Sequence, residues 1–201
     1  MEQERKLSLG PFDLIRPIGK GSMGVVWEGV HRVQSIPMAI KVLTKVGAQD
    51  ETFQQAFTNE VRAVAKLHHP SIIRLLDYGT TDEALFEASG GEIASGSQFY
   101  AMELATGGTL PKPKSPLPWL QMRYLLLELL DALAHAHARD VIHRDIKPGN
   151  ILLMKEKSIS RAMLTDFGIA KAVGAKDLPD GMVAGTPRYM APEQILNQTR
   201  D

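Results

Sequence analysis

The chain has 201 residues, 44% of them apolar, which is enough to bury a hydrophobic core. Lys plus Arg and Asp plus Glu both number 23, so the bulk charge gives no reason to expect a nucleic acid or an anionic membrane as partner. Cysteine is absent, which excludes disulfides and thiolate metal sites, and neither a secretory signal nor a membrane-spanning run is visible. We therefore expect a cytoplasmic protein with no membrane contact in this stretch, although a membrane anchor further along a longer parent protein stays open.

The first half of the chain is typical of strands with one helix. Residues 12–18, 25–30, 36–43, 72–78 and 98–103 are rich in β-formers and predict strands. Residues 50–67 predict a helix, because Phe53, Phe57, Val64 and Leu67 fall on one face. Glu60 lies on that same face, and a carboxylate there needs a cationic partner because burying it alone is costly. Residues 80–97 hold several glycines and small side chains, and we expect a long loop.

The second half predicts one long helix followed by loops and short β runs. Several prolines over residues 111–118 indicate a stiff linker. Residues 118–139 then predict a helix whose buried side carries Met122, Leu125, Leu126, Leu129, Leu130 and Leu133. Because strands come first and the helix later, we expect two lobes that join near residues 103–110.

A glycine-rich segment, Gly19-Lys20-Gly21-Ser22-Met23-Gly24, lies between the first two expected strands. A G-x-G-x-x-G pattern also opens dinucleotide-binding folds, but there a helix follows the glycines, whereas here a strand is expected. Glycines remove the Cβ clash, so a hairpin of this kind can lay backbone N–H groups over phosphates. On these residues alone, phosphate binding and a plain glycine-rich turn are equally open.

Lys41 lies in the middle of the expected strand 36–43, where a lysine is most often a plain surface residue. The carboxylate of Glu60 changes that expectation. An ammonium and a carboxylate from different elements can pair, and the pair would place Lys41 against phosphate oxygens.

The strongest chemical signal is the segment 143–150, which reads HRDIKPGN. A carboxylate at Asp145 can orient a hydroxyl or accept its proton, and the amide oxygen of Asn150 can bind Mg²⁺. Residues 166–168 read DFG, and the pair GTPRY and MAPE follows over residues 185–193. Taken singly, an Asp before Gly is usually only a turn, and MAPE is only a helix start broken by proline.

Together, in this order and on these elements, the five segments resemble the motif set of the eukaryotic-like Ser/Thr protein kinases of bacteria. The resemblance covers about residues 12–193. It implies an α+β, two-lobed kinase-like fold, with an antiparallel sheet and one helix in the N-lobe and a mainly helical, incomplete C-lobe. The expected domains are an N-terminal extension over 1–11, an ATP-binding N-lobe over 12–103, and a hinge with a partial C-lobe over 104–201.

The resemblance also implies roles for individual residues. Asp145 would be the catalytic carboxylate, Lys147 would assist it and favour Ser/Thr over Tyr substrates, and Asn150 and Asp166 would bind Mg²⁺. Lys41 would hold the α- and β-phosphates of ATP and pair with Glu60. The backbone from Glu103 to Ala105 would bond the adenine edge, and the remaining ATP contacts would come from Ile18, Gly19, Lys20, Gly21, Ser22, Met23, Gly24, Val25, Val26, Ala39, Met102 and Leu152.

Two features depart from the family. Kinase domains normally continue through further helices, whereas this chain stops soon after Glu193, so we expect a C-terminally truncated fragment that is poorly soluble or partly folded alone. Residues 169–185 contain no Ser, Thr or Tyr, so activation by phosphorylation there is not expected. Asp177 or Asp180 could replace the phosphate, although solvated loop acids are the simpler interpretation, and Thr186 and Tyr189 lie in the substrate-facing stretch.

Two other functions compete with that of a protein kinase. A nucleotide-binding pseudokinase or scaffold usually lacks Lys41, Asp145 or Asp166, and all three are present. A small-molecule kinase of the aminoglycoside phosphotransferase type shares the fold, but Lys147-Pro148 argues against it. The six histidines have no carboxylate or cysteine at ligand spacing, so structural or solvent roles are favoured over a metal site. The expected partners are proteins with Ser/Thr hydroxyls, not nucleic acids.

Overall fold

The structure is a computed structural model that describes residues 7–21, 24–43, 51–110, 118–156, 159–167 and 187–195. The chain divides into two compact units, the first formed by Met1–Ala65 with Arg74–Leu104 and the second by Lys66–Ile73 with Ala105–Asp201. Residues 66–73, expected in the N-lobe, therefore cluster with the second unit. The assignment of an ATP-binding lobe and a catalytic lobe to these ranges stays a prediction.

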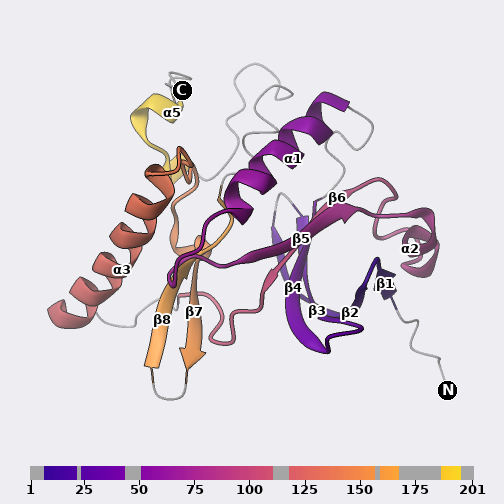
Figure 1. Ribbon diagram of the computed structural model, residues 1–201, viewed down its shortest axis with the longest axis horizontal. Coiled ribbons are helices and arrows are strands. Elements are labelled where there is room, and N and C mark those ends of the chain that lie inside the picture. Colours follow the sequence, from indigo (N-terminus) through magenta and orange to yellow (C-terminus); the bar gives the residue numbers. More distant parts are fainter. Residues whose placement is uncertain are drawn as a thin grey trace. The chain divides into compact units, whose positions relative to one another are not determined.

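A six-stranded antiparallel sheet, in the order β1-β2-β3-β4-β6-β5, forms the body of the first unit (Figure 1). The strands are β1 (Leu7–Leu9), β2 (Phe12–Gly21), β3 (Gly24–His31), β4 (Ile36–Leu43), β5 (Leu75–Thr80) and β6 (Gln98–Glu103). The bounds of β4 and β6 match the expected ones. Strand β5 begins at Leu75, later than expected, because Ile72 instead forms a parallel β-bridge with Leu164 within the second unit.

The sheet is covered differently on its two faces. One face carries a hydrophobic core whose members include Leu9, Phe12, Leu14, Trp27, Met38, Ile40, Val42, Leu85, Ile93, Phe99 and Ala101. Helix α1 (Glu51–Ala65) buries Phe53, Phe57, Val61 and Val64, and its Phe57 ring lies 6.5 Å from the ring of Tyr100 on β6. Because successive side chains of a strand alternate in direction, Tyr100 lies on the face opposite to Phe99 and Ala101, and α1 packs on that face.

The expected loop over residues 80–97 is wrong, because this segment contains helix α2 (Glu83–Ala88). Asp82 caps the helix by accepting a hydrogen bond from the Leu85 amide at 2.9 Å. The Thr81 hydroxyl donates to the Ala94 carbonyl at 2.7 Å and so closes the base of the segment. Leu85 and Ile93 enter the sheet's core, which makes the insertion a structural part of the first unit.

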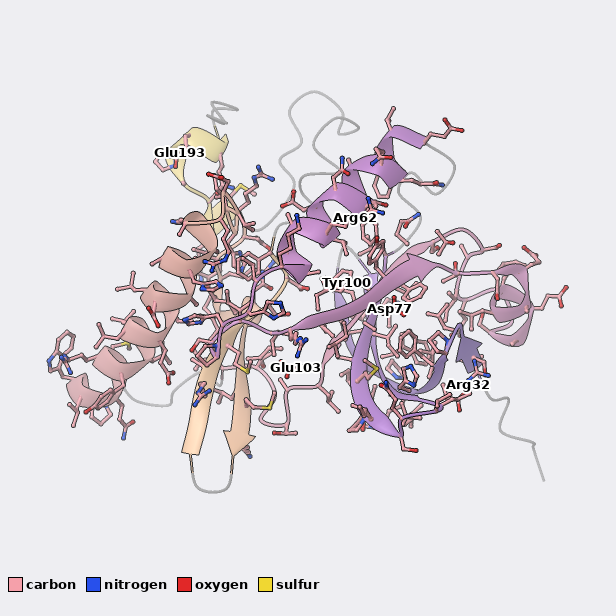
Figure 2. The ribbon with its side chains drawn as sticks, viewed as in Figure 1. Arg32, Arg62, Asp77, Tyr100, Glu103 and Glu193 are labelled. Carbon is pink, nitrogen blue, oxygen red and sulfur yellow. The ribbon has the colours of Figure 1, made fainter. Side chains whose placement is uncertain are left out.

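Strand β1 lies within the range that was expected to be an extension. It pairs with β2, and α2 packs against it. The turn between the two strands is held by polar contacts: Ser8 donates to the Asp13 carboxylate at 3.0 Å, and Arg32, labelled in Figure 2, donates to the Gly10 carbonyl. The guanidinium of Arg32 also lies 3.6 Å from the Asp13 carboxylate. Residues 7–9 thus form an edge strand of the sheet.

The second unit combines a long helix with a short hairpin. Helix α3 (Trp119–His137) packs against β8 (Ile159–Leu164), which pairs with β7 (Ile151–Glu156). Glu128 of α3 accepts a hydrogen bond from the Ala162 amide at 3.1 Å. The second unit also contains the short helices η1 (Pro148–Asn150), η2 (Pro187–Tyr189) and α5 (Pro192–Ile195).

The expected buried side of α3 is only partly correct. Leu129, Ala132 and Ala136 are buried, whereas Leu126 is 43% exposed and Leu130 is 60% exposed. The helix approaches the hairpin along a narrow stripe in which alanines allow close packing, and the wide leucine face extends beyond that stripe. None of the helices in the described part of the chain has the length and apolarity of a membrane span.

Candidate active site

The glycine segment forms the tip of the β2–β3 hairpin, where Gly21 pairs with Gly24. Gly24 has a φ of +152°, and a Cβ there would lie 2.2 Å from the Val42 carbonyl oxygen of β4, so this position must be glycine for packing reasons. A Cβ on Gly21 would meet nothing within 4 Å, and one on Gly19 would only touch Val26. The hairpin therefore has no internal need for glycine at positions 19 and 21, and its bare backbone there suits the approach of a ligand. Ser22 and Met23 lie outside the described residues.

The strand register places four predicted ATP-site residues on one face of the sheet. Lys41 pairs with Val26 on one side and with Tyr100 on the other, and Ala39 pairs with Met102. Paired residues of neighbouring strands point to the same face, as do residues two apart on one strand. Val26, Ala39, Lys41 and Met102 therefore lie together, on the face that α1 covers.

Lys41 is only 8% exposed, and its Nζ lies 5.9 Å from the centroid of the Tyr100 ring. The same ring contacts Phe57 of α1, and Glu60 follows Phe57 by three residues, which is nearly one helical turn. This arrangement turns the Glu60 side of α1 toward the Lys41 face of the sheet. The direct ion pair between Lys41 and Glu60 stays a prediction.

A hydrogen bond between side chains fixes α1 against the sheet. The Nε of Arg62, a residue of α1 that is labelled in Figure 2, donates to the hydroxyl of Tyr78 on β5 at 3.0 Å. Arg62 lies two residues after Glu60, so this contact also sets the rotation of the helix. Neither Arg62 nor Tyr100 was singled out from the sequence, although Tyr100, two residues before Met102 on the same strand, could have been found from the alternation of side chains.

The remaining predicted ATP contacts of the first unit differ in what they offer. Ile18 and Lys20 are exposed on β2. The Val25 side chain packs against the hydrophobic core, so only its backbone is available at the hairpin. The Glu103 amide donates to the Arg74 carbonyl at 3.0 Å within the sheet, which leaves the Glu103 carbonyl as the group that can bond a base.

In the second unit, the segment 143–150 forms a closed network around Asp145. The Asp145 Oδ2 accepts from Lys147 Nζ at 2.8 Å and from Asn150 Nδ2 at 2.9 Å. Asn150 Nδ2 also donates to the Asp145 carbonyl at 2.8 Å, and η1 brings the Asn150 amide to the Lys147 carbonyl at 2.9 Å. Three of the predicted catalytic and metal residues are thus brought together by their own short loop.

His143 lies beneath this loop and is 1% exposed. Burial is the largest influence on its imidazole and lowers the pKa from the usual 6.5. The ring is therefore neutral near pH 7. Its Nδ1 accepts from the Asp145 amide at 3.3 Å, and therefore its Nε2 carries the proton and donates to the Thr165 carbonyl at 3.1 Å. A neutral imidazole thus joins the loop 143–150 to the segment after β8.

That segment carries Asp166 and Phe167. Asp166 adopts a φ of +58°, which is uncommon for a residue with a Cβ and is often found at functional sites. Phe167 is buried, and its ring lies 4.5 Å from the His143 ring. The packing of Phe167 on His143 therefore fixes the position from which the Asp166 carboxylate extends. Gly168, Asp177, Asp180 and Thr186 lie outside the described residues.

Leu152 and Ala105 complete the predicted set. Leu152 is half-buried on β7 and forms an antiparallel bridge with Thr109. Ala105 is half-buried, and its carbonyl accepts from the Gly108 amide at 3.5 Å in a turn. Gln194 of α5, the residue that directly follows the MAPE motif, donates its side-chain amide to the Arg144 carbonyl at 2.9 Å.

Sequence comparison finds several bacterial relatives. Serine/threonine-protein kinase PknA of Mycobacterium tuberculosis is 38% identical over 192 residues, which cover 93% of this chain and 42% of the relative. Serine/threonine-protein kinase PknH of Mycobacterium bovis is 34% identical, over 94% of this chain and 30% of the relative. Serine/threonine-protein kinase pkn2 of Myxococcus xanthus is 34% identical, over 96% of this chain and 22% of the relative. The chain spans less than half the length of these relatives.

Solved structures agree in fold. The crystal structure of the kinase domain of PknI from Mycobacterium tuberculosis matches with a TM-score of 0.66 and 27% identity, over 82% of this chain and 62% of that chain. A double mutant of the same domain matches with a TM-score of 0.74 and 26% identity, over 100% of this chain and 70% of that chain. The expected α+β kinase-like fold is confirmed. The sequence model of the family described as "Protein kinase domain" matches residues 12–201, and the chain therefore belongs to the protein kinase family.

Proposed function

We propose that this chain is the catalytic part of a Ser/Thr protein kinase, which transfers the γ-phosphoryl group of ATP to Ser or Thr hydroxyls of proteins. The observation that carries the proposal is the Asp145 carboxylate, held by Lys147 at 2.8 Å and by Asn150 at 2.9 Å. A carboxylate fixed in this way can accept a hydrogen bond from a substrate hydroxyl and orient its oxygen for attack. In the reaction a bond forms between that oxygen and the γ-phosphorus, the bond from phosphorus to the ADP oxygen breaks, and the hydroxyl proton is released.

The first unit would supply most of the ATP contacts. The bare backbone at Gly19 and Gly21 would cover the phosphates, and the ammonium of Lys41 would neutralise part of their charge. Val26, Ala39 and Met102, which share the Lys41 face, would contact the adenine together with Ile18 and Leu152. The Glu103 carbonyl and the Ala105 amide would bond the edge of the base.

Protein kinases generally use ATP with a divalent metal, and the second unit has suitable ligands for one. The amide nitrogen of Asn150 is committed to Asp145, so its amide oxygen is the atom that can bind a cation. Asp166 would supply a carboxylate oxygen. An amide oxygen and a carboxylate, completed by phosphate oxygens and water, form the all-oxygen donor set that Mg²⁺ prefers. The metal would neutralise phosphate charge during transfer.

Lys147 supports a Ser/Thr rather than a Tyr substrate. It lies two residues after Asp145, and its ammonium contacts the carboxylate that would face the substrate hydroxyl. In that position the ammonium can stabilise negative charge on the transferring phosphoryl group as well as hold the carboxylate. The relatives PknA, PknH and pkn2 carry the name serine/threonine-protein kinase. We place the reaction in the cytoplasm, where ATP and Mg²⁺ are available.

A transfer assay set beside a binding assay tests the proposal. The purified protein is incubated with radiolabelled ATP, Mg²⁺ and a generic protein substrate, and the labelled residue is identified by phosphoamino-acid analysis. We expect label on Ser or Thr, and none when EDTA removes the metal. ATP binding without transfer would instead indicate a pseudokinase, and transfer to an aminoglycoside but not to protein would indicate a small-molecule kinase.

A further inference from the structure

One side chain joins α5 to the catalytic loop. Gln194 is half-buried; its Nε2 donates to the Arg144 carbonyl at 2.9 Å, and its Oε1 accepts from the Ala191 amide at 3.1 Å. One end of the carboxamide meets an acceptor and the other meets a donor, so its orientation is fixed. Near neutral pH a carboxamide can form both bonds, whereas an ionised carboxylate of the same length can only accept.

The carbonyl that Gln194 holds belongs to the peptide between Arg144 and Asp145. The nitrogen of the same peptide, the Asp145 amide, donates to His143 Nδ1 at 3.3 Å. Both poles of this peptide are therefore hydrogen-bonded to side chains. Arg144 adopts a φ of +58°, a left-handed conformation that a residue with a Cβ keeps only where its surroundings hold it. A rotation of the peptide would break both bonds and move the Asp145 side chain.

We propose that Gln194 is a positioning residue for Asp145. It acts through the Arg144 carbonyl, locks the peptide that carries the catalytic carboxylate, and thereby couples the α5 segment to the reacting group. The inference rests on the proposed kinase function for its kinetic consequence, but the lock itself is a property of the loop. Loss of the lock should lower kcat and leave the binding of ATP unchanged.

The test compares Gln194→Leu and Gln194→Glu with matched variants of Gln121, an exposed glutamine on α3. Leu fills similar volume and forms neither bond, whereas Glu keeps the acceptor and loses the donor. For both Gln194 variants we expect kcat to fall about three- to tenfold, as loss of the hydrogen bond to the Arg144 carbonyl predicts, and KM for Mg-ATP to stay within about twofold. The Gln121 variants should match the wild type.

A pH profile separates positioning from general damage. A protonated carboxyl group has an O–H donor, so Gln194→Glu regains the missing bond as its carboxyl group is protonated. The ratio of its kcat to that of the wild type should rise as the pH is lowered from 8 toward about 5.5, near the acid range in which such a carboxyl begins to protonate. The corresponding ratio for Gln194→Leu should stay flat. Parallel ratios for the two variants would overturn the donor role.

Hydrogen exchange supplies a measurement that does not depend on activity. In Gln194→Leu the amides of residues 143–150 should exchange faster than in the wild type or in Gln121→Leu, while α1 and β6 stay unchanged. If the wild type transfers no phosphate, the proposed function fails and this exchange alone decides the inference. Unchanged exchange over residues 143–150, unchanged kcat in both Gln194 variants, or loss of cooperative melting in both would overturn it.

Discussion

The side-chain amide of Asn150 donates both to the backbone carbonyl and to the carboxylate of Asp145, at 2.8 and 2.9 Å. The proposed metal ligand therefore holds the proposed catalytic carboxylate. Lys147 contacts the same carboxylate oxygen as Asn150. Because the three side chains share one oxygen atom, a change at any of them will also move the other two, and single substitutions must be chosen to keep the shape of the loop.

The first prediction is that Asp145→Asn lowers phosphoryl transfer by about two to four orders of magnitude, because an amide cannot take up the hydroxyl proton and carries no negative charge to pair with the Lys147 ammonium. ATP binding should stay near the wild-type value, because Asp145 acts on the hydroxyl. Asp140→Asn, an exposed change just before the loop, is the matched control. Transfer rates and a fluorescent-nucleotide titration measure the two effects, and substantial transfer by the Asp145→Asn variant would remove Asp145 from its role.

The second prediction concerns the α1 face of the sheet. Lys41→Met and Glu60→Gln should each lower kcat/KM for ATP by about tenfold or more, because the ammonium loses its phosphate contact or its expected partner. Glu87→Gln, on the exposed side of α2, should have no effect. Double-mutant analysis decides the pairing: combined losses well below the product of the single losses would support it. Fully multiplicative losses would mean that Lys41 and Glu60 act separately.

The third prediction separates two glycines of the same hairpin. Gly24→Ala should cost about 2–4 kcal/mol of unfolding free energy, because its Cβ would overlap the Val42 carbonyl and its backbone is left-handed. Gly21→Ala should leave stability unchanged within about 1 kcal/mol, because nothing lies near its Cβ. Its effect should appear instead as a raised KM for ATP. Urea denaturation and steady-state kinetics measure the pair, and equal destabilisation by both changes would contradict the structure.

The fourth prediction follows from the buried imidazole of His143. Burial lowers its pKa in the folded protein, so below pH 6.5, the usual value, the unfolded chain binds a proton that the folded protein does not. The free energy of unfolding should therefore fall as the pH drops below about 6.5 and level off near neutrality. The pKa of His135 is lowered in the same direction by its own burial, so the comparison is made with His143→Gln. That variant should be less stable at pH 8 and show a shallower loss on acidification; an identical slope would assign the effect elsewhere.

Much of the fold followed from sequence patterns that reflect local physics. The bounds of β4 and β6 were predicted because both segments are rich in apolar, β-forming residues, although Lys41 interrupts β4 and Gln98 and Glu103 lie at the ends of β6. Helix α2 was missed because six residues are too few for a periodic pattern, and the neighbouring glycines suggested a loop. Its only local signal was Asp82, a good N-cap residue followed at once by Glu83.

In the candidate site, too, contacts between neighbouring residues could be predicted from the sequence, whereas contacts between distant residues could not. The loop 143–150 forms its contacts within a few residues, so its residue types already indicated the network around Asp145. The lock by Gln194 joins residues that are far apart in the sequence, and no periodicity marks such a contact. On α3, the leucine pattern predicted which face is apolar, but which leucines are covered depends on the width of the partner surface. Leu129 is buried and Leu130 is exposed for that reason.

The insertion between β5 and β6 sets where a recombinant domain can begin. The family match starts at residue 12, and a protein trimmed to that point would lack Leu9, which is buried in the same cluster as Leu85 and Ile93. Without β1, apolar side chains of this cluster beside α2 would be exposed to solvent, and the hydrogen bond from Ser8 to Asp13 would be lost. Sequence boundaries taken from the shared family therefore cut through this protein's own core, and expression should start upstream of Leu7.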